Sequence, residues 1–144
     1  MIIFHFLSVK FKLPQRRLLK QWLHLLAEAE GKKTGDLSIV FCSNEELLTI
    51  NRQYLQHDYF TDIITFDYSK GDCLSGDLFI SYEMVRLNTR IYRQSFGDEL
   101  RRVMAHGLLH LCGYRDATAA ERKKMRAAEN RCLKKWDDLS LPPA

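Results

Sequence analysis

Two short apolar segments in the middle of the chain are joined by a connection that restricts the fold. DIITFDY, residues 62–68, is rich in β-branched and aromatic side chains, and DLFIS, residues 77–81, has the same character. Both patterns predict strands. The residues between them, SKGDCLSG, favour turns and are too few to hold a crossover helix. We therefore expect the two strands to pair antiparallel.

The rest of the chain mixes further strands with amphipathic helices. Two capping boxes, Ser43 with Glu46 and Thr118 with Glu121, mark helix starts, and Pro14 is placed to open a helix. Because strands and helices do not strictly alternate, we predict an α+β fold for a single layered domain spanning 1–144, with a small mixed four-stranded sheet and about five helices. The predicted strands cover 2–9, 37–42, 62–68 and 77–81, and the predicted helices cover 14–30, 43–55, 82–94, 98–112 and 118–136.

The composition excludes several classes of protein. A hydrophobic content of 46% and a charged content of 28% exclude a wholly disordered chain. No apolar run approaches the roughly 20 residues that span a bilayer, and the opening MIIFHFLSVKFK lacks the basic start and cleavage site of a signal peptide. The four cysteines form no CxxC pair, which favours reduced thiols and a cytoplasmic protein.

Charge is unevenly distributed along the chain. Residues 84–135 carry thirteen Lys and Arg against five Asp and Glu, whereas residues 44–83 carry two against eight. A basic C-terminal half beside an acidic middle is consistent with a polyanionic partner such as nucleic acid. The alternative is that these charges only solvate helices.

The predicted helix 98–112 carries two histidines on one face. Its apolar residues, which recur at helical spacing, form one stripe. At about 100° per residue, His106 and His110 lie roughly 40° apart on the flank of that stripe. Two imidazoles at this spacing are neighbours and can bind one cation. The stripe consists of Leu100, Val103, Met104, Gly107, Leu108 and Leu111.

A glycine and a carboxylate follow the two histidines. Gly113 is placed to end the helix in the left-handed conformation, so that the chain can reverse and bring Asp116 back to the pair. Two histidines and one carboxylate with an open position suit Zn²⁺ or another divalent transition metal. Gly107 stands where the HExxH motif has its glutamate, so the general base of a metalloprotease is absent. The alternative is a capped helix that carries two imidazoles.

The segment HGLLHLCGYRD at 106–116 resembles the HGxLHLxGYDH signature of the YbeY family, metal-dependent endoribonucleases implicated in maturing ribosomal RNA. NRQYLQHDYFTDIITF at 51–66 is similar to the family's N-x-x-Y-R-x-x-D-x-x-T-D-V-L-S-F block, and GDLFIS at 76–81 to its GDI-x-IS strand. The segment 98–100 corresponds to the DEL or REL triplet before the histidine helix. The resemblance implies a fold with a zincin-like metal helix.

Three positions depart from the family pattern. Asp116 stands where the family usually has a third histidine ligand, which lowers the net charge of a divalent site and should weaken its Lewis acidity. Arg115 replaces an aspartate. Leu55 replaces an arginine that suits phosphate binding, and Arg52, Arg115 or a helix arginine are the candidates to take its place. Asp62 either orients a water at the metal or anchors the start of its strand.

The resemblance implies a metal-dependent endoribonuclease of the cytoplasm that cleaves single-stranded RNA in ribosomal RNA maturation and ribosome quality control. We expect His106, His110 and Asp116 to hold one divalent metal per chain, with Zn²⁺ as the expected ion. The expected partners are ribosomal RNA and ribosome-associated proteins, with no membrane. Two alternatives stay open: an RNA- or ribosome-binding factor with a structural metal, and a metal-dependent hydrolase of a small molecule or peptide. The sequence assigns no general base, cleavage site or oligomeric state.

Overall fold

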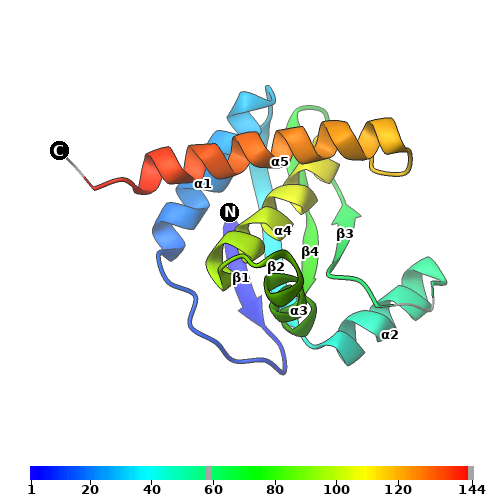
Figure 1. The fold of residues 1–144 in the computed structure, drawn as a ribbon. Helices are drawn as coiled ribbons and strands as arrows, with labels where there is room; N and C mark the ends of the chain where they lie inside the picture. The colour runs from blue at the N-terminus through cyan, green and yellow to red at the C-terminus, as the bar shows by residue number, and fades with distance from the viewer. Residues whose placement is uncertain (58–59, 143–144) are drawn as a thin grey trace.

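The computed structural model describes residues 1–57 and 60–142. Within them, four strands and five helices confirm the predicted α+β architecture (Figure 1). The strands are β1 (Ile2–Phe6), β2 (Lys33–Cys42), β3 (Ile63–Asp67) and β4 (Cys73–Ser81), and the helices are α1 (Arg16–Ala29), α2 (Asn44–Leu55), α3 (Tyr82–Tyr92), α4 (Phe96–Leu111) and α5 (Ala119–Ser140).

The strands form one mixed sheet in the order β1-β2-β4-β3. β2 pairs parallel with both β1 and β4. The connections are long enough for this, since α1 lies between β1 and β2, and α2 and β3 lie between β2 and β4. β3 pairs antiparallel with β4, with Ile63 opposite Ile80, as the short connection between them predicted. β3 therefore occupies one edge of the sheet.

Several boundaries differ from those predicted. β1 ends at Phe6 rather than at residue 9, because beyond the bond from the Leu7 amide to the Phe41 carbonyl its neighbour β2 gives way to α2. β2 and β4 begin at Lys33 and Cys73, earlier than predicted, because these two residues pair with each other in the parallel ladder. Pairing between strands thus extends them beyond their apolar cores.

The helix ends also differ in detail. α1 begins at Arg16, after Gln15 in a left-handed conformation with φ 58°, so Pro14 precedes the helix and does not open it. α5 continues past Trp136 to Ser140, with a Lys134–Asp138 ion pair of 3.0 Å on its exposed side. Both predicted capping boxes are present, at the starts of α2 and α5.

Helices cover the two faces of the sheet unequally. The main core lies between one face and α1, α4 and α5, and Figure 1 shows α4 and α5 in front of the sheet. On the other face, Leu47 of α2 packs with Cys42 and Ile64 in a smaller cluster. Trp22 of α1 ties α5 to this core, because its indole N–H donates to the Cys132 carbonyl at 2.9 Å. α5 is thereby fixed across α4.

α4 lies close to the sheet beside β3 and β4. Every residue of its predicted apolar stripe is buried, which confirms the stripe. A methyl group on Gly107 would lie 2.7 Å from Ile63 Cδ1 and 3.1 Å from the Leu78 methyls, so glycine permits this close approach. The Gly107 side of α4 therefore lies directly against β3 and β4.

No helix in the described residues is long and apolar enough to cross a membrane. All four cysteines are free thiols, as predicted. Burial raises the pKa of Cys42 and of Cys132 to about 12 in each case. These thiols are consequently protonated packing groups, not nucleophiles.

Candidate metal centre

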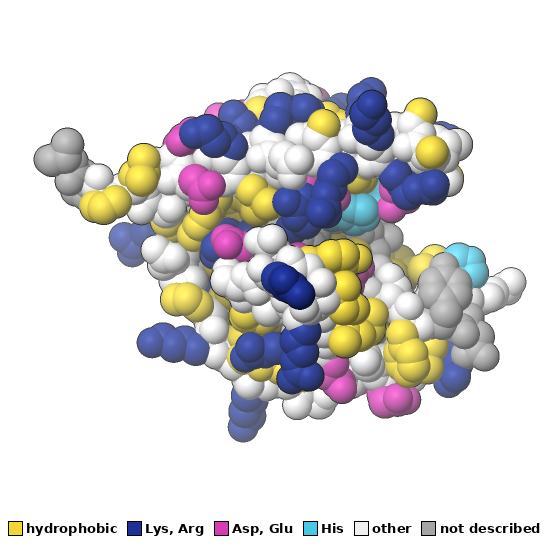
Figure 2. Space-filling view, viewed as in Figure 1, with side chains coloured by type: hydrophobic (Ala, Val, Ile, Leu, Met, Phe, Trp, Pro, Cys, Tyr) yellow, Lys and Arg dark blue, Asp and Glu magenta, His cyan; other side chains and the backbone are white. Residues whose placement is uncertain are grey.

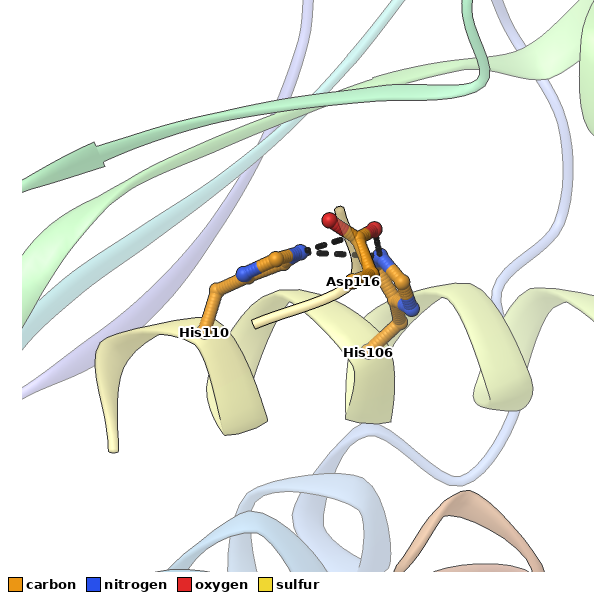
Figure 3. Close-up of side chains that lie close together, drawn as sticks. All are labelled: His106, His110 and Asp116. Carbon is orange, nitrogen blue, oxygen red and sulfur yellow. Dashed lines mark hydrogen bonds and ion pairs between the residues drawn. The ribbon is translucent and has the colours of Figure 1, made fainter. Parts of the chain in front are cut away.

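The turn after α4 brings three side chains together. Gly113 adopts the positive φ, 102°, that the sequence predicted, and the chain reverses around it. His106 and His110 point from α4 toward Asp116 on the returning segment (Figure 3). The three side chains are partly exposed and were all predicted from the sequence as one site.

The donor atoms of this triad form a compact triangle. His106 Nε2 lies 3.0 Å from His110 Nε2, and Asp116 Oδ2 lies 3.3 Å from the first and 3.4 Å from the second. Ligands at the usual zinc distances of about 2.0–2.1 Å in a tetrahedron are themselves separated by about 3.3–3.4 Å. The triangle therefore has the dimensions of three ligands around one small divalent cation.

Hydrogen bonds fix which ring nitrogens face the centre of the triangle. His110 Nδ1 lies 3.0 Å from the Tyr114 carbonyl oxygen, and His106 Nδ1 lies 2.7 Å from Glu129 Oε2. A carbonyl and a carboxylate accept hydrogen bonds, so both Nδ1 atoms must be the donors. Both Nε2 lone pairs then converge with a carboxylate oxygen, and such a set of acceptors requires a cation or a proton between them.

Glu129 of α5 joins the triad to a basic cluster. Its side chain is only 6% exposed, and while Oε2 contacts His106, Oε1 lies 3.0 Å from Arg102 Nη1 and 3.7 Å from Arg126 Nη1. One buried carboxylate thus orients an imidazole of the triad, holds the Arg102 guanidinium and has that of Arg126 nearby. The sequence reasoning missed Glu129, although it stands among the buried positions of α5, where a charged residue is unusual.

The charges of this network shift the pKa values of its members. Burial by itself would lower the pKa of His106, but the hydrogen bond and the charge of Glu129 outweigh it and leave that pKa raised. Burial would raise the pKa of Glu129, but its bonds to His106 and Arg102 outweigh it and leave that pKa lowered. Without metal, the pair therefore favours an imidazolium beside a carboxylate.

The triad lies in a cleft of about 930 Å³. Four basic side chains of α4 and α5 line it, namely Arg102, Arg122, Lys123 and Arg126. Figure 2 shows Lys and Arg side chains gathered over α5, with hydrophobic side chains over α3 below them. A metal-binding group in a cleft with a cationic wall suits a phosphate-bearing substrate.

The other predicted substrate-contacting residues lie in different places. Asp62 lines the cleft, where burial raises its pKa and Asn88 Nδ2 donates to its Oδ2 at 3.2 Å. Arg52 is not among the described residues that line the cleft, and Arg115 lines a separate hollow of about 310 Å³. Leu55 lines the cleft. The roles of Arg52, Asp62 and Arg115 stay predictions.

Comparison with known proteins gives close relatives. The family model described as endoribonuclease YbeY matches residues 7–137. The chain is 51% identical to endoribonuclease YbeY of Parabacteroides distasonis over 83% of this chain and 84% of the relative. It is 50% identical to endoribonuclease YbeY of Bacteroides thetaiotaomicron over 88% of this chain and 92% of the relative.

Among solved structures, the solution structure of TM1509 from Thermotoga maritima resembles this fold with a TM-score of 0.64. It is 25% identical, and the match covers 94% of this chain and 89% of that one. The family match spans residues 7–137, and the identities to the two relatives extend over most of both chains. The chain belongs to the endoribonuclease YbeY family.

Proposed function

We propose that the protein is a metal-dependent endoribonuclease that cleaves single-stranded RNA. The observation that carries the proposal is the convergence of His106 Nε2, His110 Nε2 and Asp116 Oδ2 on one point in a cleft with a cationic wall. The relatives named endoribonuclease YbeY support RNA as the substrate. The excess of basic residues in 84–135 supports a polyanionic ligand.

In this proposal the triad holds one divalent metal, and Zn²⁺ is the expected ion because two imidazoles and a carboxylate are ligands that it favours. When bound, the metal supplies Lewis-acid polarisation of a phosphate oxygen and activation of water. The Nδ1 atoms of the two histidines also matter for metal binding, because Glu129 and the Tyr114 carbonyl accept their hydrogen bonds and hold both imidazoles in the tautomer that binds metal through Nε2.

The basic residues of the cleft have a separate role. Arg102, held by Glu129 and by Asn130 Oδ1 at 3.0 Å, is a fixed guanidinium next to the triad. We assign to it and to Arg126 the neutralisation of the phosphate, the task that Leu55 cannot perform. A planar guanidinium can bind two phosphate oxygens at once and stabilises charge that develops on them.

The setting of this activity is also proposed. We place the protein in ribosomal RNA maturation and ribosome quality control in the cytoplasm, with ribosome-associated proteins as partners, and we expect residues 1–144 to act as one catalytic domain. Membership of the family supports the role in ribosomal RNA maturation, and the four free thiols support a reducing compartment. The main core, which joins α1, α4 and α5 to the sheet, supports a single catalytic domain.

Cleavage of single-stranded RNA by purified protein tests the proposal. Wild type should cleave, whereas His106→Ala and Asp116→Ala should lose both near-stoichiometric metal and cleavage but still bind RNA. His5→Ala, on β1 and away from the cleft lining, is the matched control and should behave as wild type. Metal-loaded wild type that binds RNA without cleaving it would instead support an RNA-binding factor with a structural metal.

A further inference from the structure

Carboxyl groups also line the cleft, beside its basic wall. Asp62 before β3, Asn88 of α3 and Glu99 of α4 all line the cleft there. Asn88 donates to Asp62 Oδ2 at 3.2 Å, and the charges of Glu99 and Asp62 repel each other. Three elements that are distant in sequence thus bring two carboxyl groups and one amide together.

Glu99 lies near the positive charges of Arg102 and Arg126, which favour its ionised form, without a direct contact to either. It is only 5% exposed, yet among the described residues none forms a hydrogen bond or an ion pair with its carboxyl group. Burial raises its pKa, and the charge of Arg102 only partly opposes this. The Glu99 oxygens are not among the fully buried polar atoms that lack a partner, so they reach the open cleft, where a ligand that donates hydrogen bonds would stabilise them.

The separation of Glu99 from the triad along α4 fits one nucleotide. Glu99 precedes His106 by two turns on the same side of α4, which is about 10 Å along the helix. Tyr92 follows Asn88 by one turn of α3, lines the same cleft and is 56% exposed. A nucleotide with its phosphate near the triad can therefore direct its base toward Asp62, Asn88 and Glu99, where Tyr92 offers a ring for stacking.

Electrostatics decides which part of the nucleotide goes there. Phosphates are repelled by the carboxyl groups of Asp62 and Glu99 and attracted to Arg122 and Lys123 of α5, whereas the charges of Arg102 and Arg126 already act on Glu99. An uncharged base suffers no such repulsion. We therefore expect the phosphates of a bound strand along α5 and one base between β3, α3 and the start of α4.

The acceptors of the cluster select among the bases. An ionised carboxylate only accepts hydrogen bonds, and its two oxygens match two adjacent N–H groups. Of the four RNA bases, only unpaired guanine offers two such groups side by side, N1–H and N2–H, and the Asn88 amide can serve the neighbouring O6. We propose that Asp62, Asn88 and Glu99 form a subsite for an unpaired guanine base; this inference rests on the proposed ribonuclease function.

Binding of mononucleotides tests the subsite without cleavage, because they contain no internucleotide bond. We expect guanosine monophosphate to bind about tenfold more tightly than adenosine monophosphate or inosine monophosphate, the second of which lacks the N2 amine. A factor of about ten is what the loss of one good base contact costs. Nuclear magnetic resonance titration of the whole protein should shift the Asn88 side-chain signal and the Ile63 amide. Equal affinities for the three nucleotides would overturn the proposal.

Variants locate the preference. Glu99→Gln and Asn88→Ala should each reduce it to about twofold or less, since each removes one partner of the guanine edge. Asp98→Asn makes the same carboxyl-to-amide change at a neighbouring residue that does not line the cleft, and Leu87→Ala changes an exposed residue of α3; both should keep the wild-type preference. A preference that persists in Glu99→Gln and in Asn88→Ala would contradict the assignment.

RNA cleavage distinguishes this proposal from the broader one. If wild type cleaves RNA and replacement of guanosine by inosine beside the cut lowers kcat/KM about tenfold, both proposals hold. If cleavage is indifferent to this replacement and the nucleotides bind equally, the subsite is wrong and the ribonuclease function stands. If no RNA is cleaved but guanosine monophosphate is preferred, the ribonuclease function fails and the subsite stands.

Discussion

Replacement of Glu129 by glutamine tests whether the metal centre depends on a residue of α5. The carboxylate contacts His106 Nδ1 at 2.7 Å through one oxygen and Arg102 Nη1 at 3.0 Å through the other. Glutamine has the same size but only one acceptor oxygen, so it can serve His106 or Arg102 but not both. Either the imidazole loses its orienting partner or a donor faces a donor at Arg102.

The expected cost follows from this geometry. Loss of a carboxylate that orients a metal-bound histidine lowers metal affinity by about 10- to 100-fold. Glu129→Ala should also destabilise the protein, by about 3 kcal/mol, because it leaves the mostly buried Arg102 without its ionic partner. The side chain of Arg102 is 18% exposed, so solvent compensates little, whereas Arg126, at 58%, should contribute little to this cost.

Competition of the purified protein with a zinc-sensitive chelator measures the affinity, and thermal unfolding of the metal-free protein measures the stability. Asp137→Asn, on an exposed position of the same helix, is the control and should change neither. The reasoning would be refuted by a Glu129→Gln protein that binds metal within a factor of about two of wild type while His106→Ala binds none.

Three further predictions concern RNA, pH and packing. Arg122→Ala combined with Arg126→Ala should weaken RNA binding for all sequences and reduce the slope of log affinity against log salt by about 1.4, measured by fluorescence anisotropy over a salt series; an unchanged slope would exclude these residues as phosphate contacts. Burial raises the pKa of Glu99 above its ordinary value of 4.5, so its ionisation destabilises the folded state as pH rises through that raised pKa. Glu99→Gln should therefore raise the melting temperature at pH 7 but not at a pH below 4.5. An equal effect of this variant at both pH values would contradict that sign. Gly76→Ala would place a methyl group 2.3 Å from the Phe66 carbonyl oxygen in β3. We expect urea unfolding to show a free energy of unfolding lower by about 2–3 kcal/mol, and a variant as stable as wild type would contradict this clash.

Local chemistry made much of the site predictable. The four-residue spacing of His106 and His110, the glycine that ends the helix and the carboxylate three residues beyond it are all set by the geometry of one helix and one turn. The capping boxes of α2 and α5 and the antiparallel pairing of β3 with β4 are equally local, since short-range spacing and a short connection decide them.

Contacts between residues that are distant in the sequence could not be predicted from it. Nothing in the spacing of residues places Glu129 against His106, because that contact depends on how α5 crosses α4, and the bond from Trp22 to Cys132 shows how α1 helps to hold it there. The sheet order and the early starts of β2 and β4 depend on which strands meet, which local propensity does not encode.

The sequence by itself therefore determined the elements, the three residues of the candidate metal site and the family, because helix periodicity, turn chemistry and motif spacing act over a few residues. Only the tertiary structure decided what surrounds those three residues. It placed Arg102 and Arg126 beside Glu129, left Arg115 in a separate hollow, and brought Asp62, Asn88 and Glu99 from three elements into the lining of the cleft. The physical reason is that burial and electrostatic pairing depend on distances in space, and packing of the whole core sets those distances.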